Sequence, residues 1–293
     1  MSRRKRGLVE RVVFFAYRRA PVRRVVRALH GPRFPKKWVF VVGCYNSGTT
    51  LLHDLIGLHP DVATLPREGV RYTAELSRPE DYGWTRMWSE CVDRIALAPQ
   101  REPDRARTIV ADWSPLFDSR RRVFLEKSIS NLPRMEWLDL NFAHAYFVGI
   151  IRNPYAVAEG IRRHARPRPP VSDRFGDRYP IELPARQWLV ANTMLMDRSQ
   201  HVERFTLLRY EDLVTEPVVS LGKVFRFLEE PIPPMTFEAG ALSVGGGHMP
   251  IAGTTNETSV ARLTDDDLAA INAVVASHTE RFGYLHAEQR RAG

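Results

Sequence analysis

The chain has few cysteines and no long apolar run, and both absences narrow what it can be. Its two cysteines, Cys44 and Cys91, lie far apart without the spacing of a zinc site or a disulfide framework, which favours a reducing compartment. No apolar stretch approaches the roughly 20 residues that cross a bilayer. The basic N-terminus also lacks the apolar core and cleavage site of a signal peptide. We therefore expect a cytoplasmic protein.

Acidic residues are almost absent from the N-terminal segment. Residues 1–37 contain 13 Lys or Arg and a single acid, Glu10, for a net charge of +12, so residues 38–293 sum to −3. Apolar residues recur within this segment at helical spacing, and Pro21 divides it. The pattern predicts a basic amphipathic arm, residues 1–37, followed by one domain, residues 38–293.

The arm leaves two interpretations open. It can lie on an anionic membrane surface through residues 1–31, on the inner face of the membrane, or it can be a basic extension that is unstructured or packed on the domain. Nucleic acid is not an expected partner, because no basic groove or stacking aromatic motif follows the arm.

A phosphate-binding loop that lacks its lysine follows the first predicted strand. Gly43 and Gly48 have the spacing of a P-loop, but Thr49 stands where a nucleotide triphosphatase has lysine. A strand that turns through glycine into a helix directs free backbone N–H groups and the positive helix end at one point. The hydroxyls of Ser47, Thr49 and Thr50 add donors. The motif predicts an anion site without the reach to a γ-phosphate, unless it is only a glycine turn with capping hydroxyls.

Apolar runs and helical patterns alternate along the domain. Strands are predicted at 38–42, 123–125, 145–151 and 205–208, and helices at 51–58, 155–164, 185–200, 218–228 and 265–277. A helical section is expected over 72–118, a surface loop over 165–184 and a flexible glycine segment at 245–248. The alternation predicts one α/β P-loop-like domain with a mostly parallel central sheet flanked by helices on both faces.

Three motifs in order resemble the sulfotransferases that use 3′-phosphoadenosine 5′-phosphosulfate (PAPS), nearest the tyrosylprotein and bacterial carbohydrate or small-molecule branch. Residues 42–52 resemble the 5′-phosphosulfate loop, 147–154 the 3′-phosphate strand and helix, and 208–213 the third signature. The resemblance implies transfer of a sulfuryl group from PAPS, without a metal, to a hydroxyl of a carbohydrate, lipid or other small acceptor. It also explains the missing lysine, since this donor has no γ-phosphate.

The resemblance assigns the donor to residues from all three motifs: Asn46, Ser47, Gly48, Thr49, Thr50, Arg152, Gly160 and Tyr210. Arg152 would clamp the 3′-phosphate, with Arg162 or Arg163 as further candidates, and Tyr210 would contact the adenine. Two positions depart from the family pattern. Asn46 replaces a basic residue, and Gly160 replaces a serine.

Glu68 and Lys127 are the catalytic candidates. Glu68 lies in a Pro-Arg-Glu-Gly segment that resembles the one carrying the catalytic glutamate, so it would be the general base, although it could instead form a salt bridge to Arg67 or Arg71. His53, on the helix after the loop, is the alternative base. Lys127 would supply the charge missing at Asn46, or would simply pair with Glu126.

Two other functions remain open. A degenerate domain could bind the nucleotide without turning it over while the arm tethers it to a membrane. A P-loop kinase is disfavoured by Thr49. The sequence identifies neither the acceptor nor the oligomeric state.

Overall fold

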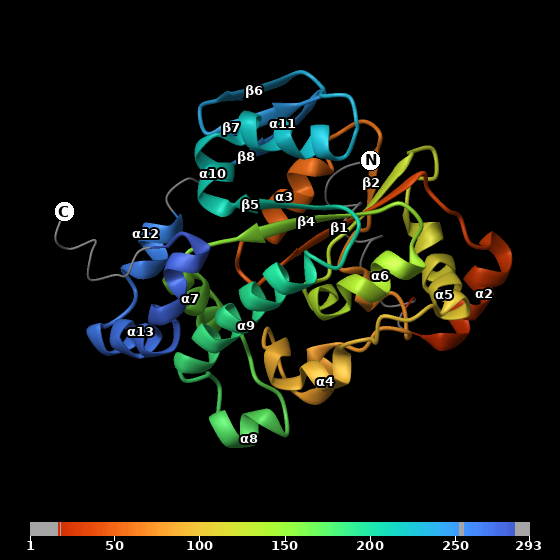
Figure 1. Cartoon of the computed structure of the whole chain (residues 1–293). Helices are drawn as coiled ribbons and strands as arrows, with labels where there is room; N and C mark the ends of the chain where they lie inside the picture. Colours follow the sequence, from red (N-terminus) through yellow and green to blue (C-terminus); the bar gives the residue numbers. More distant parts are fainter. Residues whose placement is uncertain (1–16, 18, 252–254, 285–293) are drawn as a thin grey trace.

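The structure, a computed structural model, describes Tyr17, residues 19–251 and residues 255–284 (Figure 1). Five strands form the central sheet: β1 (Lys37–Gly43), β2 (Val62–Thr64), β3 (Val123–Glu126), β4 (Ala145–Ile151) and β5 (Phe205–Arg209). Their order is β2-β3-β1-β4-β5, and every neighbouring pair is parallel. The predicted α/β fold with a parallel central sheet is confirmed.

Helices cover both faces of this sheet (Figure 1). The α-helices are α2 (Ala20–His30), α3 (Thr49–Ile56), α4 (Val92–Ile95), α5 (Pro103–Trp113), α6 (Met135–Asn141), α7 (Pro154–His164), α8 (Val171–Phe175), α9 (Glu182–Arg198), α10 (Tyr210–Thr215), α11 (Pro217–Phe227), α12 (Thr255–Val260) and α13 (Asp265–Thr279). Short 3₁₀ turns span Gly69–Arg71, Pro79–Tyr82, Trp88–Cys91, Ser114–Leu116, Ile129–Arg134 and Glu280–Phe282. In Figure 1, α3, α10 and α11 lie above the sheet and α6, α7 and α9 below it.

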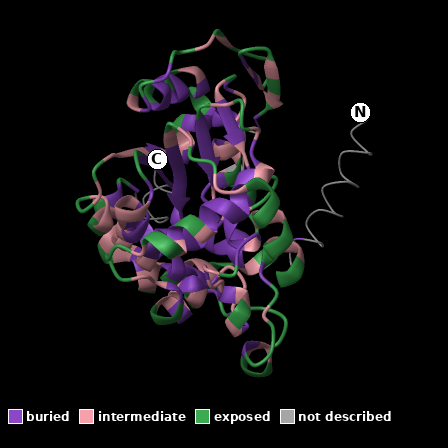
Figure 2. Cartoon of the chain, turned by 90° about the vertical axis from the view of Figure 1, so that its right-hand side faces the viewer, coloured by how far each residue is buried: buried purple, intermediate pink, exposed green. Residues whose placement is uncertain are grey.

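The central strand β1 contributes to a separate core on each face. Trp38 and Phe40 point into an aromatic core in which the ring centroids of Trp38 and Phe142 are 5.0 Å apart. Val39 and Val41 point into an aliphatic core beneath α3 and α11. Figure 2 shows buried residues gathered on these inner strands. Burial of both faces fixes the register of β1 and therefore the place where its carboxyl end delivers the loop.

The section 72–118, predicted to be helical, is mostly irregular. It contains α5 and the single turn α4, joined by 3₁₀ turns. The buried side chain of Arg134 holds it to the domain, because its Nε donates to the carbonyl of Ile95 at 2.6 Å and its guanidinium also donates to the carbonyl of Ser77. These two backbone carbonyls of the irregular section thus have hydrogen-bond partners without forming a helix.

The sequence analysis missed several elements. β2 is three residues long, and α8 lies within the predicted surface loop. A second, antiparallel sheet joins β6 (Met235–Glu238), β7 (Ala241–Val244) and β8 (Gly247–Pro250). The glycine segment predicted to be flexible forms the turn between β7 and β8, with Gly245 and Gly246 at φ 53° and 93°. Two positive φ values suit a tight hairpin turn.

The described part of the arm packs on the domain. The helix α2 begins at Ala20 with Pro21 in its first turn, and Arg27 Nε lies 3.1 Å from Asp112 Oδ1 on α5. The backbone N–H of Arg33 donates to Ser114 Oγ at 2.8 Å. Residues 1–16 lie outside the described part of the chain, and no described helix is long and apolar enough to cross a membrane.

Candidate active site

A pocket of about 520 Å³ lies beyond the carboxyl ends of the central strands. The segment following each of the five strands contributes to its wall, in the order Asn46, Glu68, Lys127, Arg152 and Tyr210. Parallel strands bring these chain segments to one edge of the sheet. The topology therefore brings together most of the residues that the sequence analysis selected from five distant segments.

The loop between β1 and α3 forms one wall and depends on a glycine. Gly48 has φ 92°, and a Cβ at this position would collide with the ring of Tyr210. Thr49 and Thr50 line the pocket at the start of α3. Ser47 is buried within the loop and, unlike the prediction, does not line the pocket; its hydroxyl has no hydrogen-bond partner among the described residues. A loop with a free helix start and an unsatisfied hydroxyl fits a phosphate group.

Arg152 and Tyr210 form the side of the pocket next to this loop. Arg152 is 8% exposed, and its guanidinium carbon lies 4.1 Å from the centroid of the Tyr210 ring. Its Nη1 donates to the carbonyl of Asn46 at 2.8 Å, and its Nε donates to Asn256 Oδ1 at 2.7 Å. Burial lowers the pKa of Arg152 from its ordinary value, but a guanidinium remains charged in proteins. A fixed, stacked cation suits a bidentate anion contact.

The two further arginine candidates lie outside this arrangement. Arg162 forms two hydrogen bonds to Asp267 on α13, at 2.6 and 2.7 Å. Arg163 Nε donates to Glu159 Oε1 at 2.9 Å. Neither lines the pocket, so Arg152 is the one of the three candidate arginines that does.

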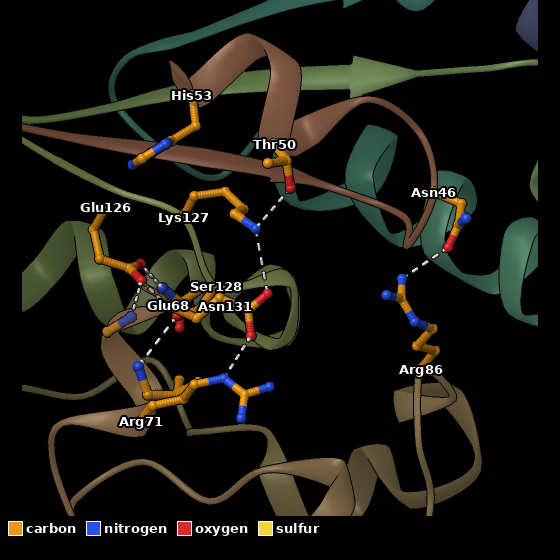
Figure 3. A network of polar contacts seen from close by, with 12 residues as sticks. Asn46, Thr50, His53, Glu68, Arg71, Arg86, Glu126, Lys127, Ser128 and Asn131 are labelled. Carbon is orange, nitrogen blue, oxygen red and sulfur yellow. Dashed lines mark hydrogen bonds and ion pairs between the residues drawn. The ribbon is translucent and has the colours of Figure 1, made fainter. Parts of the chain in front are cut away.

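Lys127 links the loop to Glu68 on the opposite wall (Figure 3). Its Nζ lies 3.1 Å from Thr50 Oγ1 and 3.4 Å from Glu68 Oε1. The second carboxylate oxygen of Glu68 lies 3.6 Å from Arg71 Nε. The ionic partner of Lys127 is therefore Glu68, whereas Glu126 lies in a separate buried network. The salt bridge to Arg71 also forms, and it leaves Glu68 in the pocket wall.

Buried hydrogen bonds to Glu126 support the turn that carries Glu68. Glu126 Oε1 accepts from the N–H of Gly69 at 2.7 Å and from Ser128 Oγ at 2.5 Å, and Oε2 accepts from Asn131 Nδ2 at 2.5 Å (Figure 3). Burial raises the pKa of Glu126 from 4.5 to about 7, against the opposing effect of these hydrogen bonds. Glu126 thus fixes the position of Gly69 from behind the pocket.

The structure also places residues that the sequence analysis missed or misplaced. Glu80, Arg86 and His164 line the pocket without having been predicted. His53, the alternative base, bonds to Asp54 at 2.8 Å and does not line the pocket. Gly160 is likewise absent from the wall and lies behind Asn46. Arg86 carried no sequence signal, because it lies in the section that was predicted to be helical.

Residues 39–234 match the sequence profile of the sulfotransferase family. The chain belongs to the sulfotransferase family. The match confirms the predicted resemblance and identifies the chain as an enzyme of sulfuryl transfer. No curated protein matches the chain. Among the described residues, no group of three or more His, Cys, Asp or Glu could hold a metal ion.

Solved sulfotransferase structures share this fold. Sulfotransferase STF1 from Mycobacterium tuberculosis H37Rv has a TM-score of 0.53 and 13% identity, over 92% of this chain and 80% of its own. The sulfotransferase domain of the Synechococcus PCC 7002 olefin synthase has a TM-score of 0.50 and 18% identity, over 86% of this chain and 96% of its own. At such identities the likeness concerns the fold alone.

The raised pKa of Glu126 predicts a pH-dependent stability. Because the folded protein binds this proton more tightly than the unfolded chain, the contribution of Glu126 to the free energy of unfolding falls as pH rises from 4.5 to about 7. Glu126→Gln should remove this loss. The free energy of unfolding of the variant, relative to that of wild type, should therefore rise by on the order of 3 kcal/mol between about pH 5 and pH 8. Urea denaturation at both pH values measures the difference. Glu238→Gln, on the exposed strand β6, is the control and should track wild type.

Proposed function

We propose that this sulfotransferase moves a sulfuryl group from PAPS to a hydroxyl of a small-molecule, carbohydrate or lipid acceptor. The observation that supports this proposal best is that the glycine loop, Arg152 and the linked pair Lys127–Glu68 line one pocket. In this proposal the loop, Arg152 and Tyr210 bind the donor, and Lys127 and Glu68 act on the transfer.

Each residue has a role that its contacts support. The N–H groups at the start of α3 and the hydroxyls of Thr49 and Thr50 stabilise charge on the phosphosulfate. Glu68 accepts the proton of the acceptor hydroxyl as the new O–S bond forms. The S–O bond to the donor phosphate breaks, and the bisphosphate leaves with the negative charge. Lys127, at 3.1 Å from Thr50 and 3.4 Å from Glu68, holds a positive charge between the loop and the base.

Arg152 tests the donor assignment. Wild type should bind 3′,5′-adenosine bisphosphate in calorimetry and should not require magnesium. Arg152→Ala should weaken this affinity by about 10- to 100-fold, because a charged hydrogen bond contributes about 1.5–3 kcal/mol. Arg226→Ala, which removes an exposed arginine of α11, should leave the affinity unchanged. Uptake of ATP with magnesium in place of the bisphosphate would instead support the kinase alternative.

Glu68 tests the catalytic assignment. Glu68→Gln should lower turnover by about 10² to 10⁴, the usual contribution of a general base, while the affinity for the bisphosphate stays at the wild-type value. Turnover is measured as bisphosphate release from PAPS, with an acceptor found by screening sugars, lipids and phenols. Glu80→Gln removes another carboxylate of the same pocket and is the matched control. Full activity of Glu68→Gln would assign the base elsewhere, and transfer to no acceptor would support the non-catalytic alternative.

We also propose that the basic arm associates with an anionic membrane surface through residues 1–31. Its described part exposes three apolar side chains, Val25 at 58%, Leu29 at 76% and Phe34 at 63%. The exposed Arg24 and Arg33 lie near them in the sequence. Apolar insertion combined with about 1 kcal/mol for each nearby basic residue gives reversible binding.

Point substitutions test the membrane proposal better than deletion, because Tyr17 is buried in the core and α2 packs on α5. The double variant Val25→Glu with Leu29→Glu should lose most of its cosedimentation with phosphatidylglycerol vesicles at low salt. The matched control, Val219→Glu with Ile232→Glu, changes exposed apolar residues elsewhere and should sediment like wild type. Equal binding of all three proteins would exclude this face of α2 as the contact.

A further inference from the structure

The positively charged side chains of the pocket differ in the groups that they contact. Four line it: Arg71, Arg86, Lys127 and Arg152. Arg71 and Lys127 share the carboxylate of Glu68. Arg152 stacks on Tyr210 and bonds to neutral oxygens of the domain.

Arg86 has no carboxylate partner within 4.0 Å in the described part of the chain. Its Nη1 donates to the neutral Asn46 Oδ1 at 2.9 Å. A half-buried guanidinium has lost part of its hydration. An anion bound in the pocket would compensate for this loss through charge pairing and hydrogen bonds. Arg86 is therefore the wall cation best placed to accept an anionic ligand.

The backbone of Arg86 has an unfavourable conformation that the surrounding fold imposes. Its φ is 58°, in the left-handed region that a residue other than glycine seldom adopts. The preceding residues are fixed by three hydrogen bonds: Arg168 N–H to the Gly83 carbonyl at 3.0 Å, Thr85 N–H to Tyr179 Oη at 3.1 Å, and Arg166 N–H to Thr85 Oγ1 at 2.9 Å. Such backbone strain persists where the surroundings impose it, and it concentrates at functional sites.

Asn46 and Gly160 together position the side chain of Arg86. A guanidinium only donates, so the Asn46 amide presents its oxygen to Arg86 and its NH₂ group to α7. There, a Cβ on Gly160 would lie 2.5 Å from Asn46 Nδ2. The absence of a side chain at position 160 thus leaves room for the amide that orients Arg86.

We propose that Arg86 binds the sulfuryl end of the donor and that Asn46 and Gly160 are its positioning residues. This assignment rests on the proposed function. Asn46 stands between two guanidinium groups, since its carbonyl accepts from Arg152 and its side chain accepts from Arg86. Figure 3 shows Arg86 beside Asn46, on the other side of the view from Lys127, Glu68 and Thr50. A planar guanidinium matches two oxygens of a tetrahedral anion held at the loop.

Two ligands that differ by the sulfuryl group separate this role from general nucleotide binding. Affinities for PAPS and for 3′,5′-adenosine bisphosphate are measured by calorimetry, in the cold and without acceptor. Arg86→Gln should weaken PAPS binding by about ten-fold and bisphosphate binding by less than about three-fold. Arg94→Gln removes a cation that lies over the Tyr82 ring outside the pocket, and should change neither affinity.

Gly160→Ala tests the positioning residues without touching the ligand. Its methyl group must displace the Asn46 amide, so it should reproduce the selective loss of PAPS affinity. In the Arg86→Gln background it should add little, because both changes remove the same interaction. A merely structural effect would lower both affinities equally in either background, and would overturn the assignment.

The two proposals fail in different ways. If wild type binds neither ligand, the proposed function falls and the role of Arg86 falls with it. If wild type binds both ligands and Arg86→Gln keeps the wild-type ratio of the two affinities, only the assignment of Arg86 is wrong.

Discussion

The site depends on one tight backbone turn, in which β1 passes into α3 through a left-handed glycine. Gly48 lies against the ring of Tyr210, and that ring in turn stacks on Arg152. The missing side chain at position 48 therefore allows the segments that follow β1, β4 and β5 to meet. The buried faces of β1 hold the turn in place, because any shift in its register would disturb both cores.

Elements whose local sequence and tertiary environment agree could be predicted. β1 and β4 are buried on both faces, so their apolar runs identified them to within a residue. The section 72–118 could not be predicted, since Arg134 stabilises its irregular backbone from a distant part of the chain. Glu68 and Lys127 were found through local motifs. Arg86 reaches the site by a long-range contact to Asn46 that no short pattern contains.

Charge in the pocket is divided between internal pairs and a site open to ligand. Glu68 lies between Lys127 and Arg71, so the candidate base stays fixed before any acceptor arrives. Arg86 on the other wall has the Asn46 amide, and no carboxylate, as its partner among the described residues. In the proposed function, the side with Glu68 is the preformed catalytic side and the side with Arg86 is the one that binds the anion. This asymmetry also accounts for two departures from the family pattern together, because Asn46 and Gly160 are neighbours in space.

A buried tryptophan lies directly behind each half of the site. Trp188 Nε1 donates to the carbonyl of Arg152 at 2.8 Å, and Trp113 Nε1 donates to the carbonyl of Gly69 at 3.0 Å. A ligand that shifts either backbone segment alters the hydrogen bond and polarity around one indole. Two of the six tryptophans of the chain therefore lie next to the two halves of the pocket, and single Trp→Phe replacements would separate their fluorescence signals during ligand binding.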